Sequence, residues 1–134
     1  MIEVDSIARR WVGPFDDWFA KHVEGHDGQV VHAGVDHYGA LEWLAHWDIR
    51  GLERYLMVAV LPDDDSFRGR VEFWAEAGTA THYTRRLVRS VIASPDRMEL
   101  CTEDIEEAIN VMLQIEEKNL TEAVPLPLWR THRT

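Results

Sequence analysis

The chain has 134 residues, the usual size of one domain, and we predict a single domain over residues 1–134. Its formal net charge of −10 disfavours nucleic acid and anionic membranes as partners, because both carry the same sign of charge. No apolar run reaches the roughly 20 residues that a membrane-spanning helix needs, and the N-terminal segment lacks the apolar run of a signal peptide. The single cysteine, Cys101, has no internal disulfide partner, so we expect a cytoplasmic protein.

The N-terminal part of the chain predicts two helical segments. The first covers residues 3–12, and Gly13-Pro14 then interrupts the pattern. A second segment begins at Pro14, which is tolerated in the first turn of a helix, and ends at Gly25. Its one-sided apolar pattern consists of Phe15, Trp18, Phe19, His22 and Val23.

Residues 22–37, HVEGHDGQVVHAGVDH, contain four of the seven histidines. We interpret most of residues 26–40 as a loop with a short strand at 29–33. His22 and His26 are four residues apart, a spacing at which a helix can point both at one metal ion. However, Gly25 lies between them, and the order H-V-E-G-H misplaces the glutamate for a zinc protease.

Three interpretations of this segment stay open: a metal site, a solvated loop, and a pH-sensitive or partner-contacting surface. A metal site would gather its ligands from His26, Asp27, His32 and Asp36. The solvated loop is favoured, and we predict neither a metal nor another cofactor.

The middle of the chain predicts strands. Residues 41–49 alternate with Trp43 and Trp47 on one face and His46 and Asp48 on the other. Residues 53–61 form a nearly continuous apolar run, typical of a central strand. Residues 71–77 alternate again, and residues 80–93 are rich in β-branched and aromatic side chains. Short connections make these strands antiparallel neighbours, which gives a meander of four to five strands.

The C-terminal part predicts one long helix and a tail. Thr102 is a natural N-cap, and the helix covers residues 103–119 with an apolar stripe along one side. Residues 120–134 form an extended, proline-containing tail.

The fold class is therefore α+β, with N-terminal helices, the antiparallel meander and a C-terminal helix packed on the sheet. Whether the helices share one sheet face or cover both stays open.

Candidate catalytic groups are few. On a strand, His46 and Asp48 share a face, and His82 could join them in a sheet-lined pocket of a small enzyme or ligand-binding domain. Cys101 lies near a helix start, but packing of a small side chain is favoured over a reactive thiol. A basic patch in residues 85–89 is expected to pair with Glu72 and Glu76 across the sheet.

The excess of tryptophan, six residues, predicts a binding surface. We expect a cytoplasmic protein-interaction module of the adaptor, chaperone or immunity type. It would bind another protein, with a basic partner favoured by the net charge, and homodimerisation is an alternative. The predicted contact residues are Trp43, Trp47, Asp63, Asp64, Asp65, Trp74 and Trp129. Small secretion chaperones and immunity proteins share this size and charge, but no motif carries that likeness.

Overall fold

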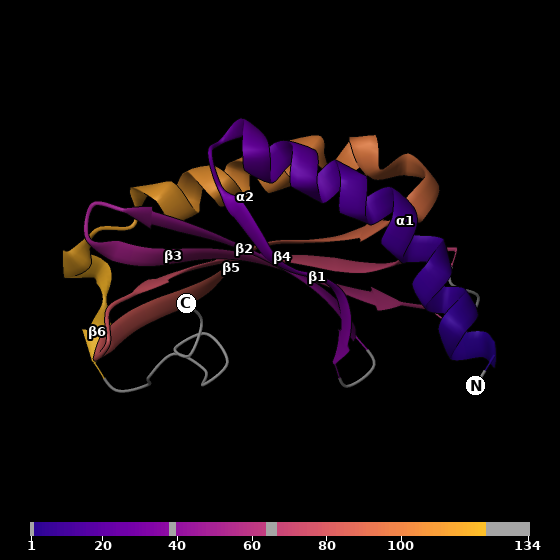
Figure 1. Cartoon of the computed structure of the whole chain (residues 1–134), viewed down its shortest axis with the longest axis horizontal. Coiled ribbons are helices and arrows are strands. Elements are labelled where there is room, and N and C mark those ends of the chain that lie inside the picture. The colour runs from indigo at the N-terminus through magenta and orange to yellow at the C-terminus, as the bar shows by residue number, and fades with distance from the viewer. Residues whose placement is uncertain (1, 38–39, 64–66, 123–134) are drawn as a thin grey trace.

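The computed structural model describes residues 2–37, 40–63 and 67–122 and has an α+β fold (Figure 1). The elements in chain order are α1 (Ile2–Gly25), β1 (Gln29–His37), β2 (Ala40–Ile49), β3 (Leu52–Pro62), β4 (Gly69–Gly78), β5 (His82–Ala93), the 3-10 helix η1 (Pro95–Cys101), α2 (Thr102–Gln114), the 3-10 helix η2 (Glu117–Asn119) and β6 (Thr121–Glu122). The strands form one antiparallel sheet in the order β1-β2-β3-β4-β5-β6. This order confirms the predicted meander, with the two-residue β6 added at its edge.

α1 is one continuous helix with Pro14 inside it, so the prediction of two helical segments was wrong. Proline removes only one backbone hydrogen bond at this position, and packing can outweigh that loss. Trp11, Phe15, Phe19 and Val23 follow one another at four-residue spacing, and all four are fully buried. The continuous apolar stripe holds the turns before and after Pro14 against the same core.

β1 is longer than expected, since the predicted loop with a strand at 29–33 is a strand from Gln29 to His37. Its pairing with β2 shifts register between Val30 and His32 and again between Ala33 and Val35. Each bulge breaks the two-residue period by which a strand is identified in a sequence. The irregular pattern therefore concealed the strand.

The two central strands follow the predicted pattern. β2 and β3 pair without a break from Leu41 opposite Val60 to Ile49 opposite Leu52. Their connection is Arg50-Gly51, whose φ angles of 55° and 77° are those of a type I′ hairpin turn. Nearly every residue of β3 is buried, as expected for a strand at the centre of a sheet.

Both α1 and α2 lie on the same face of the sheet (Figure 1), which excludes the alternative in which each covers one face. The main core lies between these helices and the sheet, and it includes Trp43, Trp47 and Phe73. We call the opposite side of the sheet the helix-free face, because no described helix packs on it. It has a smaller cluster of buried residues, which are Leu44, Tyr55, Met57 and Ala59.

α2 begins and ends differently from the prediction. Thr102 is its first residue, and the N-cap position belongs to Cys101, which makes no side-chain capping bond. The helix ends at Gln114 instead of residue 119. Two arginines of the β2–β3 hairpin bind its last carbonyl groups: Arg54 Nη1 donates to Met112 at 2.7 Å, and Arg50 donates to Leu113. Cations at this end also interact favourably with the helix dipole.

Candidate functional site

Trp43 and Trp47, two of the predicted contact residues, lie in the core beneath α1. Trp43 is fully buried and its indole N–H donates to Asp16 Oδ1 at 2.6 Å. Trp47 is 2% exposed and its indole N–H donates to the carbonyl of His26 at 2.8 Å. Both indoles therefore connect the sheet to α1 and to the segment that follows it.

Trp74 lies on the helix-free face, in β4, and is half-buried. Its indole N–H donates to Glu72 Oε1 at 3.2 Å, and the guanidinium of Arg85 stacks 4.2 Å from the ring centroid. Asp63 is exposed beyond the end of β3, with Arg68 Nε 4.0 Å from its carboxylate. The remaining predicted contact residues, Asp64, Asp65 and Trp129, lie outside the described residues.

Two exposed apolar side chains of β5 lie on the same sheet face as Trp74. Leu87 pairs with Trp74 across β4 and β5, and Ile92 pairs with Arg70, so all four share the helix-free face. Leu87 is 45% exposed and Ile92 is 68% exposed. We call this surface the β4–β5 patch and define it by Arg70, Trp74, Arg85, Leu87 and Ile92. Leu87 and Ile92 were not predicted, because in the sequence they read only as strand residues.

Ion pairs surround the β4–β5 patch. Arg70 Nε lies 3.2 Å from Glu72 Oε2, and Arg85 Nε lies 3.7 Å from Glu76 Oε2. The Glu76 carboxylate is fully buried, whereas Arg85 is 44% exposed. This arrangement confirms the predicted pairing between Arg85 and Glu76.

At the Ile92 end, the patch continues into a shallow pocket of about 410 Å³. The lining residues are Leu61, Asp63, Arg68, Gly69, Arg70 and Ile92. Asp63 therefore lies beside the same surface as Trp74, although the two residues belong to different segments of the chain.

The alternation in the sequence suggested that Arg89 pairs with Glu72, but in the structure Arg89 pairs with two carboxylates of α2. A register shift beside Phe73 and Trp74 turns Arg89 to the helix-covered face. There its Nη2 lies 2.8 Å from Glu107 Oε1 and its Nε lies 4.0 Å from Asp104 Oδ1, both in α2. A single extra residue in a strand moves every following side chain to the other face.

The alternative site of His46, Asp48 and His82 is not assembled in this structure. His46 is hydrogen-bonded instead to Glu53 Oε2, at 2.5 Å, and its ring lies 5.0 Å from that of Tyr55. Asp48 is exposed, and His82 is in β5, with β3 and β4 between it and His46.

The histidine-rich segment has a partner that the sequence did not suggest. His22 Nδ1 lies 2.7 Å from Glu106 Oε2, and His26 Nε2 lies 2.6 Å from Glu106 Oε1. The carboxylate of α2 thus bridges two imidazoles from the C-terminal end of α1. Partial burial raises the pKa of the Glu106 carboxyl group. The two imidazoles lower this pKa by more, so it lies below its usual value. The four-residue spacing suggested only a metal ion, and a solvated loop was favoured over it. The partner that both histidines share is instead a carboxylate that lies 84 residues from His22 in the chain.

Replacing Glu106 with glutamine is expected to lower the free energy of unfolding by about 1 kcal/mol near neutral pH. An ionised carboxylate accepts from both imidazoles, whereas an amide presents its NH2 group to one of them. Folding lowers the pKa of the Glu106 carboxyl group. The stabilisation that its ionised form gives is therefore complete above the pKa of the unfolded state, and it is lost as the pH falls through the pKa of the folded state. Urea unfolding from about pH 6 to about pH 3 should therefore show the wild type and the variant converging.

Asp17→Asn is the control, because Asp17 is exposed in the middle of α1, away from both helix ends. Its stability should follow that of the wild type at every pH. A difference between Glu106→Gln and the wild type that does not change with pH would argue against the bridging carboxylate.

The described part of the chain also bears on a reactive thiol, a metal site and a membrane-spanning helix. Cys101 is buried, and burial, together with Asp104 and Glu99, raises the pKa of its thiol to about 11. A thiol with this pKa stays protonated near neutral pH and packs in the core, as predicted. Among the side chains that the structure describes, which do not include that of Asp36, no group of three or more from His, Cys, Asp or Glu could hold a metal ion. The described helices include none with the length and apolarity to cross a membrane.

No protein-family model, no curated protein and no solved structure matches this chain.

Proposed function

We propose that this chain is a protein-interaction module, of the adaptor, chaperone or inhibitor type, which binds a partner protein through the β4–β5 patch. The observation that carries the proposal is the asymmetry of the sheet. Both helices pack on one face, and on the other face Leu87 is exposed opposite Trp74 and Ile92 is exposed opposite Arg70. Exposed apolar and aromatic side chains on an uncovered sheet face are typical of a binding surface.

The composition of the patch also supports partner binding. Tryptophan and arginine are the residues that most often dominate binding energy at protein interfaces. Here Trp74 and Arg85 stack on each other at the centre of the patch, and charged groups surround them. The net charge of −10 would accelerate encounter with a basic protein, whereas the patch itself would provide the contacts.

Partner binding can be tested by chemical cross-linking in extracts of the source cells, followed by mass spectrometry and calorimetry with the purified partner. Trp74→Ala is expected to raise the Kd by about 30-fold or more, which is the usual effect of truncating an anchoring tryptophan. Leu87→Asp should raise it by at least about tenfold, because the substitution buries a charge in an apolar contact.

The control is Asn110→Asp, which introduces the same charge at an exposed position of α2, on the helix-covered side of the molecule. This variant should keep the wild-type Kd for the same partner. A partner that bound Trp74→Ala and Leu87→Asp as tightly as the wild type would show that the patch is not the interaction surface.

A further inference from the structure

In the part of the chain that the structure describes, the outer edge of β5 is paired only at its beginning. β6 pairs only with His82 and Tyr83, at the beginning of β5. Among the described residues, no strand lies along the outer edge of residues 84–93. The backbone N–H and C=O groups of such an edge can bind an extended segment of another chain as an added strand.

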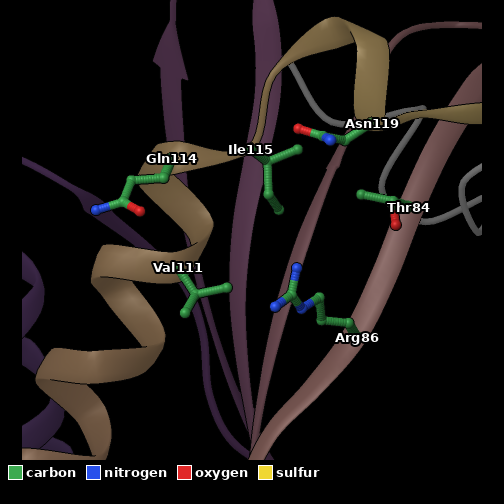
Figure 2. A pocket seen from close by; sticks show the side chains of 6 residues that line it. All are labelled: Thr84, Arg86, Val111, Gln114, Ile115 and Asn119. Carbon is green, nitrogen blue, oxygen red and sulfur yellow. The ribbon is translucent and has the colours of Figure 1, made fainter.

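A polar pocket lies beside this edge on the helix-covered face, between β5, the end of α2 and η2 (Figure 2). Its volume is about 340 Å³, and its lining consists of Thr84, Arg86, Val111, Gln114, Ile115 and Asn119. Figure 2 shows the guanidinium of Arg86 directed from β5 into the space beside α2. The Asn119 side-chain oxygen accepts the backbone N–H of Glu116 at 2.8 Å, so its NH2 group can donate elsewhere.

The three arginines of β5 differ in their partners. Arg85 is paired with Glu76, and Arg89 with Asp104 and Glu107. Within the described residues, Arg86 has no carboxylate partner. β5 has no acidic residue at all, although the whole chain has 24 acidic and 14 basic residues. An unpaired guanidinium beside amide and hydroxyl donors is suited to a carboxylate, which it can bind through two parallel hydrogen bonds.

From the unpaired edge and this pocket, we infer that β5 binds an extended acidic segment of the partner protein as an added strand, with one carboxylate held by Arg86. The inference rests on the proposed function and specifies the partner segment. A second copy of this chain is disfavoured as the occupant, because two β5 edges would bring their arginines together. An acidic segment instead complements the charge of the edge.

The register of β5 also predicts the sequence of the bound segment. In the bound segment, the residue opposite Arg86 would lie on the helix-covered face. The residues before and after it in the segment would lie on the helix-free face, beside Arg85 and Leu87. The segment should therefore have an acidic residue next to an apolar one. The apolar side chain would contact Leu87 and so extend the β4–β5 patch.

The inference can be tested by selecting peptides from a display library of random linear ten-residue sequences on the immobilised full-length protein. The selected peptides are expected to share an Asp or Glu next to an apolar residue. For a synthetic peptide from the selection, Arg86→Gln should raise the Kd by about tenfold or more, the usual effect of losing a charge-assisted hydrogen bond. Lys21→Gln, which removes an exposed cation on α1, should leave the Kd unchanged.

Two further measurements separate strand addition from side-chain binding alone. Binding of the peptide should slow hydrogen exchange at those amides of residues 84–92 that point away from β4. N-methylation of alternate peptide bonds should abolish binding for the set whose N–H groups face β5, and not for the other set. Thermal unfolding of Arg86→Gln should match the wild type, since the side chain is exposed.

Several outcomes would overturn the inference without touching the proposed function. These are the absence of selected peptides, peptides without an acidic residue, and peptides that bind Arg86→Gln as tightly as the wild type. Peptides sensitive to Leu87→Asp but not to Arg86→Gln would assign binding to the patch and not to the edge. A dimer in sedimentation that dissociates on Arg86→Gln would identify a second copy as the occupant.

Discussion

Trp43→Ala is expected to lower the free energy of unfolding by about 4 kcal/mol, the usual cost of emptying a fully buried tryptophan site. The ring of Trp43 lies 4.1 Å from that of Phe15, and its N–H is bound to Asp16. The substitution would therefore leave a cavity between β2 and α1 and remove the hydrogen bond that joins them. Urea unfolding followed by circular dichroism measures the change.

Trp74→Ala is the matched control, because the residue type is the same and the sheet face is opposite. Trp74 is half-buried on the helix-free face, so its truncation should cost only about 1 kcal/mol. The two variants thus separate a core residue from a surface residue. Equal destabilisation by both substitutions would contradict the placement of both helices on the Trp43 side.

Arg54→Met is expected to lower the free energy of unfolding by about 3 kcal/mol. Arg54 is 1% exposed and donates to the carbonyls of Met112 and Ile49, at 2.7 and 3.2 Å. Methionine fills much of the same volume but has no donor, so both carbonyls would lose this donor. Burial, together with the nearby Arg50, lowers the pKa of Arg54, which reflects the cost of holding this charge in the core.

Arg50→Met tests the exposed counterpart of this contact. Arg50 binds the neighbouring carbonyl, Leu113, at the same helix end, but water can replace it there. Its substitution should cost less than about 1 kcal/mol. If Arg54→Met were instead more stable than the wild type, desolvation of the guanidinium would outweigh its hydrogen bonds.

Elements with an undisturbed period were predictable from the sequence. The alternation of residues 41–49 correctly placed Trp43 and Trp47 on one face and His46 and Asp48 on the other. The apolar run at 53–61 correctly predicted the central strand. In both cases the local pattern and the burial agree, since neither strand has a bulge in its pairing with the other.

Features that depend on distant parts of the chain were not predictable. The bulge beside Trp74 reversed the face of Arg89, and no residue type in that segment marks it. Glu106 is a polar residue outside the apolar stripe of its helix, but it meets His22 because α1 and α2 share a sheet face. The exposed patch around Leu87 likewise depends on where the helices lie, and periodicity within one helix does not determine that.

The neighbour-to-neighbour order of the strands has a consequence for synthesis on the ribosome. Each hairpin from β1 to β5 joins segments that are adjacent in the chain, so the hairpins can form successively as the chain emerges. α2 contacts β3, β4 and β5, all of which are made before it. The part of the core that α2 covers is therefore exposed to water until residues 102–114 have left the exit tunnel, so chains that stall before that point present apolar sheet residues to solvent.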